Sequence, residues 1–200
     1  MSEMTLVLHG LAIKKHAGAE AVAGLIGVDA TKVKVLLAQA VTEGRAVESG
    51  GAFMLTPLAR MALEGEYSRA FADQRANAAF MAAYERFEVV NKELKQLITD
   101  WQTISVGGQR VPNDHSNKAH DSGIIDRLGA LHERAEVVLK ALGDGLKRLS
   151  IYATKLLTAL EKAEDGEIEW VSGAKIESYH TVWFELHEDL LRILGRERDE

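Results

Sequence analysis

Apolar residues recur at helical spacing in the first third of the chain. The clearest repeat has apolar side chains at positions i, i+3, i+4, i+7 and i+8, which places them on one buried face of a helix. These residues are Val33, Leu36, Leu37, Ala40 and Val41. Shorter apolar patterns at 6–13 and 19–26 precede it, so the sequence predicts three consecutive helices. Asp29 is expected to cap the third helix, because its carboxylate can accept the free amide hydrogens of the first turn.

A short hairpin is predicted after these helices. Residues 45–48 and 52–55 are strand-like and are joined by Ser49-Gly50-Gly51, and Gly-Gly supplies the positive φ angles that tight turns demand. Thr56-Pro57 then starts another helix, with threonine as the cap and proline in the first helical position. The first predicted domain, residues 1–65, therefore contains three helices, a hairpin and a further helix.

The second predicted domain, residues 66–200, is an antiparallel helical bundle. Apolar side chains at steps of three and four between Phe80 and Trp101 predict a long helix. Residues 103–121 show no periodicity and predict a long loop, in which Gly107-Gly108 can form a turn. Loops of this length inside a compact domain are often functional. Three further apolar stripes complete the bundle.

Polar and glycine residues predict where several helices begin and end. Ser122 is the expected cap of the helix after the loop, and Gly143-Asp144-Gly145 is its expected end. A break is also expected near Gly65. The resulting fold class is mainly α with a small β-hairpin wing, classed as α+β.

Composition and charge narrow the class of protein. A hydrophobic content of 46% with 27% charged residues is typical of a soluble globular chain. The absence of cysteine excludes disulfides and thiolate metal sites. No basic segment precedes an apolar one at the N-terminus, so the sequence predicts a cytoplasmic protein. Residues 1–63 hold six basic and five acidic residues, so their formal net charge is +1. Because the whole chain carries −6, the remaining residues carry −7.

The first domain resembles the MarR-like winged helix-turn-helix regulators over residues 5–65. The resemblance rests on the apolar stripe together with Ile26-Gly27-Val28-Asp29, Glu43-Gly44-Arg45 and Leu55-Thr56-Pro57-Leu58-Ala59-Arg60. In such families the helix after the short turn enters the major groove and the wing touches the DNA backbone. The resemblance therefore implies a DNA-binding protein that acts as a homodimer.

Outward positions of the predicted recognition helix supply the candidate DNA contacts. Thr31, Lys32 and Lys34 are expected at phosphates, and Gln39 at a base edge. Thr42 also faces outward, and Arg45 stands at the base of the wing. The alternative is a protein-binding winged helix, because a net charge of +1 is small for a DNA-binding domain and Ser49-Gly50-Gly51 offers no cation.

Histidines on apolar stripes and in the predicted loop suggest a ligand site in the bundle. The candidate residues for a small anionic ligand or a divalent metal are Asp114, His115, His132, Glu177, His180, Trp183 and His187. Glu-x-x-His on a bundle helix is a motif of carboxylate-bridged metal proteins, but those proteins use two such motifs and only one is present. The alternative is that these histidines are core residues bonded to carbonyl or carboxylate groups.

A second resemblance covers residues 84–195. Asp100-Trp101-Gln102, Asn113-Asp114-His115, Ile125-Asp126-Arg127-Leu128 and residues 178–191 are similar to a helical region of actinobacterial regulators and of phosphoenolpyruvate-utilising proteins of the pyruvate phosphate dikinase type. The phosphohistidine motif of those enzymes has Gly-Gly and Thr before its histidine, whereas Ser178-Tyr179 precedes His180. We therefore expect no catalysis by this chain alone. The sequence favours a transcriptional regulator, and the alternative is an accessory module of a phosphoenolpyruvate-utilising enzyme system.

Overall fold

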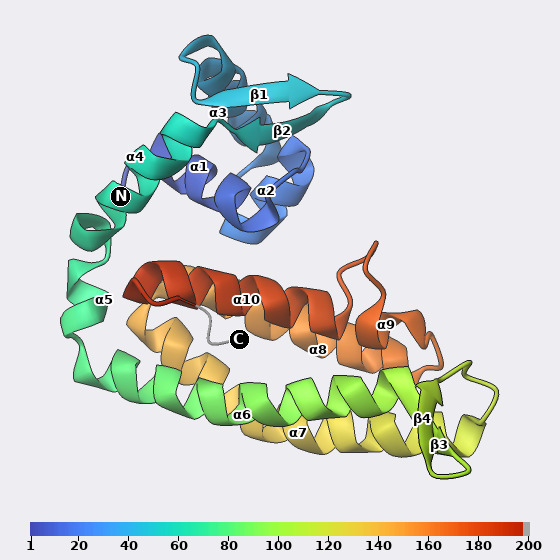
Figure 1. Ribbon diagram of the computed structural model, residues 1–200. Helices are drawn as coiled ribbons and strands as arrows, with labels where there is room; N and C mark the ends of the chain where they lie inside the picture. The colour runs from blue at the N-terminus through green and yellow to red at the C-terminus, as the bar shows by residue number, and fades with distance from the viewer. Residues whose placement is uncertain (198–200) are drawn as a thin grey trace. The chain divides into compact units, whose positions relative to one another are not determined.

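The computed structural model describes residues 1–197. The fold is mainly helical, with two small antiparallel hairpins (Figure 1). In chain order the elements are α1 (Glu3–Lys14), α2 (Ala19–Ile26), α3 (Ala30–Thr42), β1 (Ala46–Ser49), β2 (Ala52–Leu55), α4 (Pro57–Ala70), α5 (Ala72–Ala76), α6 (Ala78–Gln102), β3 (Thr103–Val106), β4 (Gln109–Pro112), α7 (Lys118–Gly145), η1 (Lys147–Leu149, a 3-10 helix), α8 (Ser150–Glu164), α9 (Glu169–Ser172) and α10 (Tyr179–Leu194). None of the helices within residues 1–197 is long and apolar enough to span a bilayer.

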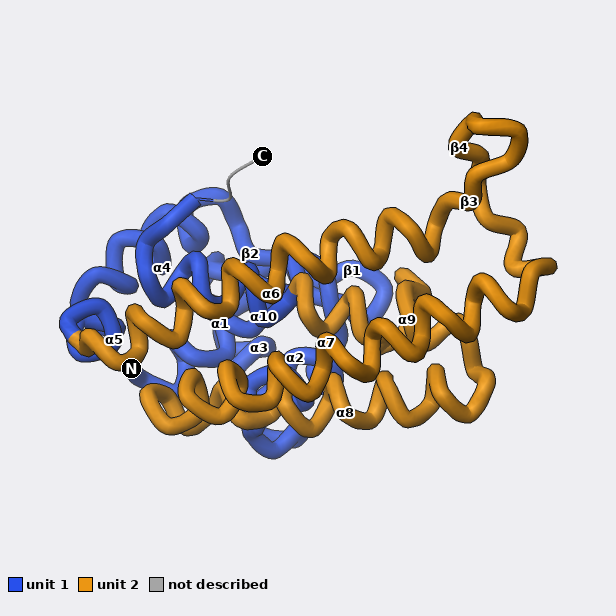
Figure 2. The backbone as a smooth tube through the Cα atoms, turned by 90° about the horizontal axis from the view of Figure 1, so that it is seen from below, with its two compact units in different colours: residues 1–76, 185–200 blue, residues 77–184 orange. Residues whose placement is uncertain are grey.

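The chain forms two compact units, coloured separately in Figure 2. Unit 1 is Met1–Ala76 together with the chain from Glu185 onward, and unit 2 is Asn77–Phe184. The helix α10 therefore contributes residues to both units. The sequence-based division between residues 65 and 66 falls inside α4, which continues through Gly65 to Ala70.

Local signals start and stop the helices of unit 1 where the sequence predicts. The Asp29 side chain accepts a hydrogen bond from the backbone N–H of Lys32, and Thr56 caps α4 in the same way with Pro57 following. Antiparallel pairing of β1 and β2 runs from Ala46 opposite Leu55 to Ser49 opposite Ala52. The Gly50-Gly51 turn has φ of 60° and 82°, a conformation that glycine adopts without steric cost. The predicted caps and hairpin are confirmed.

Close packing of α1 against α2 depends on Gly10. A Cβ atom at Gly10 would lie 2.7 Å from Ile26 Cγ2 and 3.1 Å from Val22 Cγ1, and both of those side chains are buried. Gly65 provides a matched comparison, because it also lies inside a helix but a Cβ there would meet nothing within 4 Å.

We expect Gly10→Ala to destabilise the protein and Gly65→Ala to stabilise it. Overpacking at Gly10 costs about 1–3 kcal/mol, which exceeds the gain of up to about 1 kcal/mol from replacing glycine by alanine in a helix. Only the gain applies at Gly65. Urea unfolding of both variants measures the difference, and equal stabilities would contradict the close approach of α1 to α2.

A buried polar network joins three helices of unit 1. His9 Nε2 donates to Asp189 Oδ1 at 2.9 Å, and His9 Nδ1 lies 2.9 Å from the Tyr67 hydroxyl. The side chains of His9 and Asp189 are completely inaccessible to solvent. Since a carboxylate only accepts, Nε2 carries the hydrogen of the bond to Asp189. The network fixes the end of α10 from Glu185 onward within unit 1.

The core of unit 2 contains an aromatic stack. The Trp183 ring lies 4.8 Å from Phe87 and 6.2 Å from Tyr179, with interplanar angles of 13° and 11°. Trp183 Nε1 donates to Asn91 Oδ1 at 3.1 Å. Trp183 and Asn91 are both buried, so the indole N–H and the amide oxygen satisfy each other away from water.

Several helix boundaries differ from those that the sequence predicts. The cap of α7 is Asn117, whose side chain accepts from the His120 backbone N–H, so the helix begins before Ser122. It also continues through Gly143-Asp144 to Gly145, whereas the break near Gly65 occurs instead at Phe71, after α4. Most of the predicted loop 103–121 has regular secondary structure, because residues 103–112 form the β3–β4 hairpin and α7 begins at Lys118.

Candidate functional site

The outward face of α3 is the first candidate site. The six predicted DNA contacts, Thr31, Lys32, Lys34, Gln39, Thr42 and Arg45, are all exposed. Lys32 Nζ forms an ion pair with Glu3. Glu43 accepts a hydrogen bond from Gln39 Nε2 at 2.7 Å and forms an ion pair with Arg45 Nε at 3.1 Å. Because exposed ion pairs of this kind contribute little free energy, a polyanion can compete with these carboxylates for the cations.

Exposed apolar side chains also occur in pairs on the β1–β2 hairpin and on α4, and the sequence pattern gave no separate signal for them. Val47 and Met54 are cross-strand partners in the β1–β2 hairpin, and both are exposed. Leu58 and Met61 lie one turn apart on α4 and are 77% and 70% exposed. Apolar groups gathered on a surface are typical of sites that contact other macromolecules.

The histidines predicted for a ligand site have separate surroundings. His132 is buried, its Nδ1 is 3.0 Å from the Tyr179 hydroxyl, and its Nε2 is 3.7 Å from Glu136 Oε1, beyond hydrogen-bond distance. Burial lowers the pKa of His132, and the carboxylates of Glu136 and Glu164 only partly offset that effect. Burial likewise raises the pKa of the Tyr179 hydroxyl. His132 is therefore held as a neutral ring in the core.

The remaining predicted ligand residues are also distributed. Glu177 pairs with Lys155 at 2.6 Å, Trp183 belongs to the aromatic stack, and the exposed Asp114 accepts from Ser116. His180 is half-buried in unit 2, whereas His187 is buried in unit 1. Within residues 1–197 no three histidine, aspartate or glutamate side chains are grouped to hold a metal ion.

His115 belongs to a cluster that fixes the chain between β4 and α7. Its Nδ1 donates to the buried carboxylate of Asp121 at 3.1 Å, and its ring lies 4.6 Å from Trp101. Asn113 Nδ2 donates to Asp121 at 2.9 Å and to the Trp101 carbonyl at 3.0 Å. These contacts hold His115 at a φ of 60°, a conformation that side-chain-bearing residues adopt at a cost.

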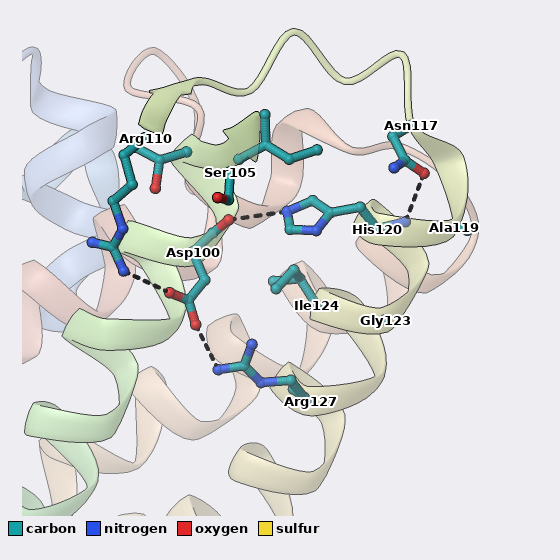
Figure 3. A pocket seen from close by; sticks show the side chains of 11 residues that line it. Asp100, Ser105, Arg110, Asn117, Ala119, His120, Gly123, Ile124 and Arg127 are labelled. Carbon is teal, nitrogen blue, oxygen red and sulfur yellow. Dashed lines mark hydrogen bonds and ion pairs between the residues drawn. The ribbon is translucent and has the colours of Figure 1, made fainter. Parts of the chain in front are cut away.

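A pocket of about 680 Å³ lies where α6 ends, the β3–β4 hairpin turns and α7 begins (Figure 3). Its wall includes Asp100, Ser105, Arg110, His120, Ile124 and Arg127. Arg127 Nη2 donates to Asp100 Oδ2 at 2.9 Å, and Arg110 Nη2 lies 3.8 Å from Asp100 Oδ1. His120 Nε2 donates to the Asp100 backbone carbonyl at 3.1 Å.

Asp100 is ionised and organises one side of this pocket. Partial burial raises its pKa, but hydrogen bonds from Arg127 and Gln96 and the charges of both arginines outweigh that effect, so the pKa lies below its ordinary value. With Arg110 and Arg127 opposed by a single carboxylate, the polar wall carries one net positive charge. None of the ligand residues predicted from the sequence, Asp114 and His115 included, lines this pocket.

Comparison of this chain with protein-family models, curated proteins and solved structures finds no match.

Proposed function

We propose that this protein is a DNA-binding transcriptional regulator whose first unit contains a winged helix-turn-helix. The observation that carries the proposal is the order α1–α2–α3–β1–β2–α4, with all six predicted contact residues exposed on α3 and at the start of the hairpin. In a winged helix, α3 is the recognition helix and β1–β2 is the wing. The major groove of B-DNA is wide enough to admit one helix.

Specific side chains have separate roles in this proposal. Lys32 and Lys34, near the start of α3, neutralise phosphates and Gln39 contacts a base edge. On DNA, Lys32 exchanges Glu3 for a phosphate, and Gln39 is released from Glu43. A homodimer presents two copies of α3 to half-sites one helical turn apart, about 34 Å.

Charge reversal on α3 tests the proposal. We expect Lys32→Glu/Lys34→Glu to weaken binding to a labelled random-sequence duplex at low salt by at least about tenfold and to reduce the slope of log K against log salt by about 2. Lys95→Glu/Lys140→Glu is the matched control, because it changes the net charge equally on exposed positions of α6 and α7. Fluorescence anisotropy across a salt series measures both quantities. Equal losses in the two variants, or no salt-sensitive binding by the unmodified protein, would rule out this role for α3.

The exposed apolar pairs favour a second candidate function, a protein-interaction module. Val47 and Met54 occupy the hairpin where a DNA-binding wing carries cations, and Ser49-Gly50-Gly51 at its tip carries none. In this proposal the partner belongs to a phosphoenolpyruvate-utilising enzyme system, as the resemblance of residues 84–195 implies. Substituting serine for Val47 and Met54 would then abolish capture of that enzyme. A pull-down that recovers no such enzyme, together with tight DNA binding by the unmodified protein, would remove this candidate.

A further inference from the structure

We propose that the pocket formed by α6, the β3–β4 hairpin and α7 binds a small organic carboxylate through the donors of Arg110 and Arg127 that Asp100 does not use. Every residue that lines it lies within positions 100–127 of unit 2. The site therefore does not depend on how the first unit functions. Its action as an effector site does rest on the proposed regulatory function.

Charge is the first argument for an anionic ligand. The chain beyond residue 63 carries −7, yet this wall holds two guanidinium groups and one carboxylate. Because the pKa of Asp100 is lowered, the wall keeps its single positive charge at neutral pH. One positive charge complements a monocarboxylate more closely than it does a doubly charged phosphate.

Unused hydrogen-bond donors are the second argument. Arg127 directs one Nη2 bond to Asp100, and the Arg110 guanidinium makes no hydrogen bond to any of residues 1–197. Both side chains remain more than half exposed. Since a guanidinium has five N–H donors in a planar fork that matches a carboxylate, each arginine retains donors for a ligand. Asp100 holds Arg127 in position and leaves its other donors available.

The size and the remaining wall define the rest of the ligand. A volume of about 680 Å³ suits a small molecule. Ile104 and Ile124 give the pocket an apolar side, and Ser105 adds a hydroxyl at the hairpin. In Figure 3 Arg110 and Arg127 reach Asp100 from the hairpin and from α7. A carboxylate bound by both arginines would therefore tie the hairpin to α7, with a short aliphatic portion against the isoleucines.

Titration of the full chain with hexanoate, followed by amide chemical shifts in NMR, tests the site without DNA. We expect saturable shifts confined to residues 100–127 at millimolar concentrations, and none with the neutral isostere hexanamide. Arg127→Gln and Arg110→Gln should each raise the dissociation constant about tenfold or more, because each removes a charge-assisted donor pair. Arg134→Gln is the control, since Arg134 is an exposed arginine on the same helix paired with Glu93 at 2.6 Å.

Three results would overturn the proposal. They are equal shifts with hexanamide, an Arg134→Gln effect as large as that of Arg127→Gln, and shifts at these residues with inorganic phosphate but not with hexanoate. A folding defect is recognised separately, because the spectrum of each variant reports whether the rest of unit 2 is unchanged. Failure here leaves the DNA-binding measurement unaffected, so the two proposals are tested independently.

Discussion

Replacing Trp183 with alanine is expected to destabilise the protein by about 4 kcal/mol. Truncating a buried tryptophan typically costs about 3–5 kcal/mol, and this one also stacks on Phe87 and Tyr179. The change leaves the buried Asn91 Oδ1 without the indole N–H that it accepts from. For a chain of this size the thermal midpoint should fall by about 8–16 °C, measurable by calorimetry.

Trp183→Phe separates packing from hydrogen bonding. Phenylalanine keeps a stacked ring and loses the bond to Asn91, so we expect a smaller cost of about 1–3 kcal/mol. Because the sequence also allowed Trp183 to be a ligand contact, hexanoate titration of Trp183→Phe adds a second readout. An unchanged hexanoate affinity with lowered stability identifies Trp183 as a core residue. Unchanged stability with a weakened hexanoate affinity would contradict the packing of Trp183 in the aromatic stack.

Replacing Asp189 with alanine is expected to cost about 3–5 kcal/mol, because it removes one partner of a fully buried pair. His9 Nε2–H would lose its acceptor in a site that water does not reach. Asp189→Asn retains an oxygen that can accept this hydrogen bond and should cost less. Chemical unfolding monitored by circular dichroism gives both values.

Two further sets of variants show whether the loss of stability in Asp189→Ala comes from the buried His9–Asp189 hydrogen bond. Asp144→Ala removes a carboxylate that is 68% exposed and paired with Lys140, and it should change stability by less than about 1 kcal/mol. The double replacement His9→Leu/Asp189→Leu removes both polar groups, so it should cost less than the two single replacements added together. Simple additivity would show that His9 and Asp189 are not energetically coupled.

Features encoded within a few residues were predictable from the sequence. Asp29 and Thr56 cap helices because their side chains reach backbone donors three residues ahead, so no tertiary information is needed. The β1–β2 hairpin follows from Gly50-Gly51. The β3–β4 hairpin has the same kind of turn at Gly107-Gly108. Ile104 and Val106 alternate with polar residues over the four positions of β3, but β4, Gln109–Pro112, shows no such alternation, so only the turn was predicted.

The pocket was not predictable because it depends on the relative register of two long helices. Asp100 and Arg127 are 27 positions apart and meet only once α6 and α7 are aligned. Apolar stripes indicate which faces of two helices are buried but not how far one slides along the other. The His9 network had no signal either, since its three members come from distant parts of the chain.

The histidines show why a residue type on a stripe is a weak guide to a binding site. His132 does lie on the buried face of α7, as predicted, but the Tyr179 hydroxyl satisfies its Nδ1 within the core. A histidine on an apolar stripe can bind a ligand or can form a hydrogen bond with another core residue, and the sequence pattern is the same in both cases. The partner is supplied by α10, 47 positions away along the chain.

The membership of α10 in both units has a consequence for biosynthesis. Asp189 follows His9 by 180 positions, which corresponds to roughly 10 to 40 seconds of translation. Throughout that interval His9 lies among apolar residues of the N-terminal segment without the Asp189 carboxylate that accepts its hydrogen bond in the folded protein. Its final packing can be completed only after the ribosome has released α10, so ribosome-associated chaperones have a long window in which to engage the nascent chain.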